Sequence, residues 1–96
     1  MITCEALRQK REAILALARR YGAYDIRIFG SVARGDASSN SDLDLVVRFE
    51  AGRSLFDHGG LLMDLRELLG VKVDVVSEGA LQGRFGENVR SEAIPL

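Results

Sequence analysis

The sequence lacks the features that mark secreted or membrane-bound chains. Among its 96 residues there is one cysteine, Cys4, so an intramolecular disulfide is excluded, which fits the reducing cytoplasm. No apolar run approaches the ~18 residues of a membrane span. No basic segment followed by an apolar one comes after Met1, so no secretion signal is recognised. We therefore expect a cytoplasmic chain that does not contact a membrane.

The chain also lacks a surplus of charge of one sign. Lys+Arg 13 against Asp+Glu 14 gives a formal net charge of -1, so no broad basic surface is available for nucleic acid. Aromatic residues make up only 6% of the chain, which leaves no stacking platform for RNA. Direct contact with nucleic acid is therefore not expected. Hydrophobic residues at 47% and charged residues at 28% are ordinary for a globular protein, and the length suits one domain over residues 1–96.

Hydrophobic periodicity and helix-end signals predict alternating helices and strands. The first expected helix covers residues 4–21 with Thr3 as the N-cap, and the second covers 32–34 with Ser31 as the N-cap. The third covers 55–69, and a glycine-containing helix follows Ser77. The expected strands cover 25–29, 42–49 and 71–76. Gly22, Gly35 and Gly70 are placed to end the first three helices.

Two aspartates lie on the second expected strand. Side chains alternate along a strand, so Asp42 and Asp44 project from one face while Leu43, Leu45 and Val47 line the other. Carboxylates roughly 7 Å apart on one strand face raise each other's pKa unless a cation lies between them. Hard divalent metals, which bind oxygen ligands and bridge nucleotide phosphates, suit that arrangement.

The first expected strand ends in a Gly30-Ser31 turn that opens a short helix. Free backbone N–H groups at such a turn, together with the positive end of the helix dipole, point at an anion. Arg34, one turn past Ser31, can reach a phosphate with two parallel hydrogen bonds. A phosphate cradle beside metal-binding carboxylates indicates phosphoryl or nucleotidyl transfer.

The third strand adds another carboxylate. Asp74 lies on the polar side of a strand otherwise built from valine, where an unpaired charge costs several kcal/mol. A metal shared with Asp42 and Asp44 would explain its presence. Lys72 lies on the same strand face and can neutralise the carboxylates or a pyrophosphate.

These motifs resemble a known superfamily. Gly30-Ser31, Gly35, Ser41-Asp42-Leu43-Asp44 and the strand-borne Val73-Asp74 together resemble the nucleotidyltransferases that include DNA polymerase beta and the kanamycin nucleotidyltransferases. More narrowly, the chain is similar to the minimal nucleotidyltransferase (MNT) group, the antitoxin partners of HEPN-domain toxins. Three further stretches carry this likeness, which thus covers nearly the whole chain: residues 54–57, 68–74 and 92–96.

The resemblance implies an α/β (α+β) fold, in which a small mixed β-sheet is flanked by helices, with ATP and Mg²⁺ as cofactors. It implies that Gly30 and Ser31 hold the nucleotide phosphates and that Asp42 and Asp44 ligate two metals. Asp74 would ligate the catalytic metal near the attacking hydroxyl. The group is implied to transfer AMP to a tyrosine of a HEPN ribonuclease toxin, in a hetero-oligomer with that toxin.

Two alternatives remain open at this point. The chain can be an antitoxin that masks its toxin by binding alone, with a vestigial metal site. It can also be a nucleotidyltransferase whose acceptor is a small molecule, such as an aminoglycoside, or an RNA end.

Overall fold

The structure is a computed structural model that describes residues 2–38 and 42–96. Its strands form one mixed sheet in the order β3-β2-β1-β4. The strands are β1 (Ala23–Phe29), β2 (Leu43–Phe49), β3 (Val73–Ser77) and β4 (Ile94–Pro95). β1 pairs antiparallel with β2 and β4, whereas β2 pairs parallel with β3. The expected mixed sheet flanked by helices is therefore confirmed.

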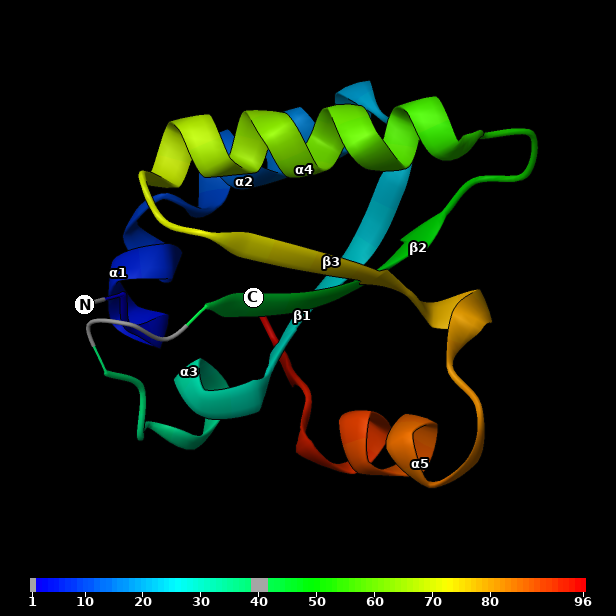
Figure 1. Ribbon diagram of the computed structural model, residues 1–96. Helices are drawn as coiled ribbons and strands as arrows, with labels where there is room; N and C mark the ends of the chain where they lie inside the picture. Colours follow the sequence, from blue (N-terminus) through cyan, green and yellow to red (C-terminus); the bar gives the residue numbers. More distant parts are fainter. Residues whose placement is uncertain (1, 39–41) are drawn as a thin grey trace.

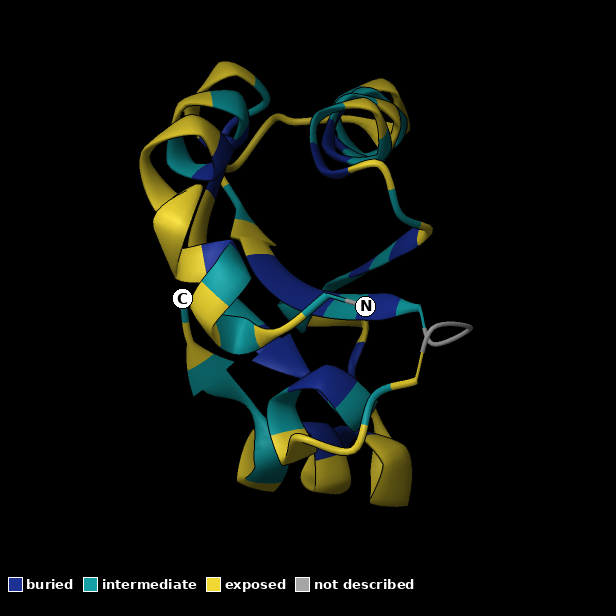
Figure 2. Cartoon of the chain, turned by 90° about the vertical axis from the view of Figure 1, so that its left-hand side faces the viewer, coloured by how far each residue is buried: buried dark blue, intermediate teal, exposed yellow. Residues whose placement is uncertain are grey.

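Two helical layers enclose the sheet. The helices are α1 (Cys4–Gln9), α2 (Arg11–Arg20), α3 (Gly30–Arg34), α4 (Leu55–Leu69), the 3-10 turn η1 (Glu78–Ala80) and α5 (Gly83–Glu92). Figure 1 shows α2 and α4 on one side of the sheet and α3 and α5 on the other. Figure 2 shows the buried stretches of the strands between these layers. None of the helices in the described ranges is both long and apolar enough to span a bilayer.

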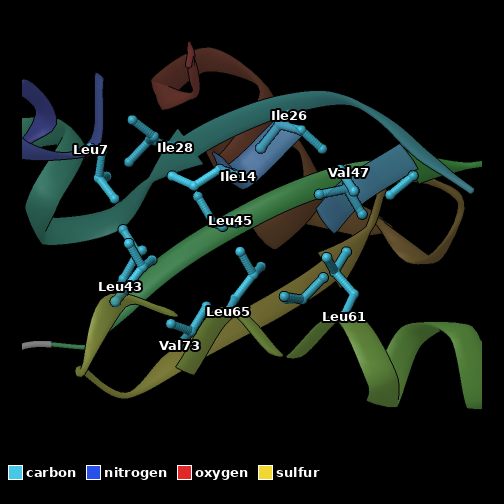
Figure 3. Packing of buried hydrophobic residues seen from close by; sticks show 14 of the residues in the cluster. Leu7, Ile14, Ile26, Ile28, Leu43, Leu45, Val47, Leu61, Leu65 and Val73 are labelled. Atoms are coloured by element: carbon cyan, nitrogen blue, oxygen red, sulfur yellow. The ribbon is translucent and has the colours of Figure 1, made fainter. Parts of the chain in front are cut away.

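Strand alternation sends each face of the sheet to a different core. Leu43, Leu45 and Val47 of β2 belong to the larger cluster under α2 and α4, in which Ile14 and Leu65 also lie (Figure 3). The smaller cluster, on the α5 side, consists of Phe29, Val46, Leu81 and Val89. Asp44 falls between Leu43 and Leu45, so it projects toward the α5 side, as the strand pattern predicts.

The expected ends of α4 are confirmed. The Ser54 hydroxyl accepts a hydrogen bond from the Phe56 N–H at 3.2 Å, and the Asp57 carboxylate accepts one from the Ser54 N–H at 3.0 Å. This capping box fixes the first turn. Gly70 then ends the helix with a left-handed backbone, φ 68°.

The single helix expected over residues 4–21 is wrong. Thr3 does cap its start, but Lys10 leaves the helical range with φ -103° and ψ 13°, which separates α1 from α2. Every side chain from Arg8 to Ala13 is exposed. No side chain there packs against the sheet, so nothing holds that turn in one continuous helix.

Two other expected helix starts are also corrected. α3 begins at Gly30 with Phe29 as its N-cap, so Ser31 lies inside the first turn rather than at the cap. The last helix does not begin at Ser77, because η1 comes first and Leu81 is extended. That extended residue turns its side chain into the cluster with Phe29 and Val46, and β4, which was not expected, follows α5.

Adjacent glycines in α4 provide a matched stability test. A Cβ at Gly60 would overlap the ring of Tyr21, whereas a Cβ at Gly59 meets nothing within 4 Å. The Tyr21 ring is fixed because its hydroxyl donates to Asp64 at 2.5 Å. We expect Gly60→Ala to destabilise the fold by about 1–3 kcal/mol and Gly59→Ala to stabilise it by up to about 1 kcal/mol, measured by urea unfolding. Equal shifts in the two variants would contradict this packing.

An ion-pair network holds α5 to the sheet. Glu78 pairs with Arg27 of β1 and, at 3.0 Å, with Arg90 of α5. These guanidinium groups, Arg90 first, hold the pKa of the Glu78 carboxyl below its ordinary value of 4.5. The charged pairs therefore stabilise the fold above about pH 4.5, and this contribution is lost as pH falls through the lowered pKa.

Thermal unfolding of Glu78→Gln tests this network. We expect the variant to melt below the wild type at pH 7, and the difference to shrink steadily below pH 4.5 as the wild-type carboxylate takes up its proton. A difference that stays constant down to pH 3 would show that the charge of Glu78 contributes nothing.

Candidate active site

The predicted site residues come from the end of β1, from α3 and from the starts of β2 and β3. Phe29 pairs with Asp44 across β1 and β2, and Asp44 pairs with Asp74 across β2 and β3. Asp42 directly precedes β2 and is described, whereas Ser41 of the motif lies outside the described residues. The register thus places the Asp44 and Asp74 backbones side by side, next to the turn that begins at Gly30.

Gly30 lies directly against the central carboxylate. Its backbone has φ 78°, and a Cβ built on it would overlap the Asp44 carboxylate. Only glycine combines this left-handed conformation with so close an approach. The glycine of the turn therefore lets β1 end against Asp44.

The electrostatics indicate mutual repulsion among the acids. Burial is the main cause that raises the pKa of Asp44, followed by the charges of Asp74, Asp42 and Glu92, while Arg34 lowers it. The structure thus brings Asp42 and Asp74 within electrostatic range of Asp44. A cation at this place would relieve the repulsion.

Two of the acids are paired with cations of the chain. Lys72 lies directly before β3, which begins at Val73 and not at residue 71 as expected, and its Nζ lies 3.6 Å from Asp42 Oδ2. Arg66 Nη2 lies 3.8 Å from Asp74 Oδ1, and the Arg66 Nε–H donates to the carbonyl of Val73 at 3.1 Å. Lys72 therefore contacts a carboxylate here, and Arg66 is a basic residue of the site that the sequence pattern did not single out.

The donor types fit a magnesium ion. Three carboxylates supply the oxygen ligands that Mg²⁺ prefers. Burial and the neighbouring acids raise the pKa of Asp44, and a bound cation would stabilise its charged form. In residues 2–38 and 42–96, however, no group of three or more His, Cys, Asp or Glu side chains is arranged to hold a metal ion. Ligation by all three aspartates would require Asp42 to turn from Lys72 and Asp74 to turn from Arg66.

The turn itself differs from the expectation of free N–H groups. The Gly30 N–H donates to Glu92 Oε1 at 2.6 Å, so it already has an anionic partner from the end of the chain. Arg34 donates to the same oxygen through Nη1 at 2.9 Å and to Asp36 through Nε at 3.3 Å. The Ser31 side chain makes no hydrogen bond in the part of the chain that the structure describes.

Glu92 is, with Arg66, a residue of this region that sequence reasoning missed. The stretch Glu92–Leu96 carries part of the family likeness, but it contains no spacing that assigns a role to the carboxylate. Its contact with Gly30 joins residues 62 positions apart. A pairing over that distance is visible only once the strands are in place.

Comparison with known proteins agrees with the geometry. Residues 10–94 match the family model described as a nucleotidyltransferase domain. The protein adenylyltransferase MntA of Thermococcus cleftensis is 37% identical over 78 residues, which are 81% of this chain and 79% of that protein. A solved structure described as a minimal nucleotidyltransferase has TM-score 0.87 and 56% identity, with coverage of 99% of this chain and 97% of that one.

A more distant structural likeness concerns the fold alone. It is to a chain of the complex between a tri-AMPylated Shewanella oneidensis HEPN toxin and its MNT antitoxin. The TM-score is 0.69 at 19% identity, with coverage of 92% of this chain and 69% of that chain.

Proposed function

This chain belongs to the nucleotidyltransferase domain family and has the polymerase beta-like fold, and on that premise we propose that it is a protein adenylyltransferase acting as an antitoxin. In this proposal it transfers AMP from ATP to a tyrosine of a cognate HEPN-domain toxin, in the cytoplasm. The observation that carries the proposal is the grouping of Asp42, Asp44 and Asp74 beside the Gly30–Ser31 turn.

The site residues take separate roles in this proposal. Asp42, Asp44 and Asp74 would hold Mg²⁺, which supplies positive charge at the α-phosphate and the leaving group. The Gly30–Ser31 turn would bind the triphosphate, and the Ser31 hydroxyl is available for it. Arg34 and Lys72 would contact the phosphates or the pyrophosphate as it leaves. Both now pair with carboxylates, with Glu92 and Asp42 respectively, so they are held close to the acids.

The reaction is a displacement at the α-phosphorus of ATP. The tyrosine hydroxyl oxygen forms a bond to that phosphorus, the bond to the bridging oxygen breaks, and pyrophosphate leaves. The hydroxyl proton passes to solvent or to a nearby carboxylate. Little covalent chemistry falls to the protein, which orients the reactants and compensates charge.

The toxin partner is supported by the relatives. The Thermococcus cleftensis relative is a protein adenylyltransferase, so its acceptor is a protein. The distant structural neighbour comes from a complex of an AMPylated HEPN toxin with its antitoxin. A hetero-oligomer of this chain with a HEPN protein follows as the proposed assembly.

One observation favours a second candidate, masking without chemistry. Asp42 and Asp74 are paired with Lys72 and Arg66, and the described residues hold no ready-made metal cluster. A vestigial site that keeps its acids neutralised by internal cations would look like this. The burial of Asp44 and the repulsion by its neighbours, which together raise its pKa, argue the other way, because they cost stability when no metal uses the site.

Intact-mass spectrometry distinguishes the two candidates. The proposed HEPN partner is incubated with this chain in ATP and Mg²⁺, with parallel samples in EDTA and without ATP. We expect the HEPN protein to gain the mass of one or more AMP groups only in the complete mixture, with a matching loss of ribonuclease activity. An unchanged mass in a stable complex that still inhibits the ribonuclease would establish masking instead.

A further inference from the structure

The C-terminal segment returns to the candidate site through β4. Figure 1 shows this red segment leading from α5 back to the sheet. Ile94 pairs with Ile28 and Pro95 with Arg27, antiparallel to β1. Continued by two residues, this register brings Glu92 beside Gly30. Glu92 is the last residue of α5 and lies just before the segment that pairs with β1, so both α5 and β4 constrain its position.

Glu92 joins the turn and α3 through one oxygen atom. Oε1 accepts hydrogen bonds from the Gly30 N–H at 2.6 Å and from Arg34 Nη1 at 2.9 Å. The Glu92 side chain is 28% exposed, against 51% for Arg34. A carboxylate that accepts from a backbone N–H and a guanidinium forms charge-assisted bonds, which are stronger than neutral ones.

The helix that carries Glu92 is fixed to the sheet. Val89 is buried against Phe29 and Val46, and the Phe85 ring meets the Phe29 ring edge-on at 6.4 Å. Arg90 is tied to Glu78, as described above. Glu92 at the end of α5 thus offers a fixed anchor to the turn.

The turn and α3 need such an anchor. α3 has only five residues, too few for a stable helix by itself. Arg34 is a long side chain on the surface, and fixing it in advance lowers the entropy lost when it binds a ligand. Without Glu92, the Gly30 N–H loses its acceptor, and the guanidinium loses the bond from Nη1 and keeps only the one from Nε to Asp36, at 3.3 Å.

We propose that Glu92 is a positioning residue, which holds the Gly30–Ser31 turn and Arg34 in the arrangement that binds the nucleotide phosphates. This inference rests on the proposed function and deepens it, because it adds a residue from the C-terminal segment to the nucleotide site. Glu92 acts through the turn and Arg34 and does not itself contact the nucleotide.

Equilibrium binding of ATP with Mg²⁺, by isothermal titration calorimetry well below the melting temperature, tests this role. Glu92→Ala removes both hydrogen bonds, and we expect the affinity for ATP to fall by about tenfold or more. Glu92→Gln keeps an acceptor for the Gly30 N–H but loses the charge opposite Arg34, so we expect a smaller fall, roughly threefold. This graded rescue by glutamine is the expected signature.

Two controls separate positioning from general destabilisation. Glu87→Ala removes another, exposed carboxylate of α5, and Ile14→Val loosens the packing of the opposite layer. Both are expected to bind ATP as the wild type does. Melting temperatures of all variants show which ones are destabilised.

The possible outcomes are distinct. Wild-type affinity in both Glu92 variants would overturn the inference and leave the proposed function standing. Tighter binding in those variants would also overturn it, since Glu92 would then compete with the nucleotide for Gly30 and Arg34. A wild-type chain that does not bind ATP at all would overturn the proposed function and the inference together.

Discussion

The Asp44→Asn variant is expected to lose AMP transfer by about a hundredfold to a thousandfold while its metal-free form becomes more stable than the wild type. Asp44 is the central acid, between Asp42 and Asp74, and its removal takes away a metal ligand and charge stabilisation of the reaction. The same removal relieves a partly buried charge that its neighbours repel. The opposite signs of the two effects distinguish a functional site from a structural ion cluster.

The pH dependence of the stability gain follows from the raised pKa. The pKa of Asp44 is higher in the folded state than its ordinary value of 3.8. As pH rises from 3.8 to the folded-state pKa, the unfolded chain gives up this proton more readily, so the fold loses stability. The gain of Asp44→Asn is therefore expected in full near neutral pH and is expected to vanish below pH 3.8. For a domain of this size, each kcal/mol of relief raises the melting temperature by about 4–8 °C.

Melting curves in EDTA, together with the transfer assay, measure both effects. Glu67→Gln, which removes an exposed carboxylate from α4, is the matched control and is expected to change neither. An Asp44→Asn variant that melts below the wild type in EDTA would show that the carboxylate stabilises the fold, against the repulsion inferred for it.

The second large effect is expected for Gly30→Ala, compared with Gly35→Ala. Both glycines have left-handed backbones, φ 78° and φ 79°, so alanine strains each by about 1–2 kcal/mol. Only at Gly30 does the added Cβ overlap the Asp44 carboxylate, since nothing lies within 4 Å of a Cβ at Gly35. We expect Gly30→Ala to lose more stability than Gly35→Ala, because the overlap adds to the backbone strain. We expect a roughly hundredfold loss of transfer for Gly30→Ala alone, the size associated with a displacement of about 1 Å.

Unfolding curves and transfer rates at saturating ATP, measured side by side, decide this comparison. Gly35→Ala controls for backbone strain at the other end of α3, because it differs mainly in the space available to the methyl group. Equal losses of transfer in both variants would mean that strain in α3 affects the site and that the approach of Gly30 to Asp44 is not important.

Local signals predict much of this fold. Helical periodicity over residues 55–69 and the Gly70 stop predict both ends of α4, and the structure adds the Ser54–Asp57 capping box at its first turn. Period-2 alternation predicts which face of β2 carries Asp44, because the pattern depends only on neighbouring residues. The turn at Gly30 is predicted for the same reason.

The departures from prediction have physical causes beyond local sequence. The break at Lys10 arises because the exposed stretch around it has no packing partner, which helical periodicity alone does not reveal. Leu81 leaves the expected helix because burial against Phe29 and Val46 outweighs helix propensity.

The details of the candidate site depend even more on distant parts of the chain. The sequence places Asp42 and Asp74 on the correct face, but their pairing with Lys72 and Arg66 depends on side-chain directions around α4 and β3. The contact of Glu92 with Gly30 requires β4, a two-residue strand without a sequence signal of its own. Residue types are thus predictable here, and their partners are not.

Nucleotidyl transfer gives each phosphate of ATP a definite fate, which labelled ATP reveals. The HEPN protein is incubated with this chain and Mg²⁺ in two samples, one with ATP labelled at the α-phosphate and one with ATP labelled at the γ-phosphate. We expect the α-label to become covalently attached to the HEPN protein while the γ-label leaves in pyrophosphate. Attachment of the γ-label would instead reveal phosphoryl transfer, and the absence of both labels from an inhibited HEPN protein would contradict enzymatic action.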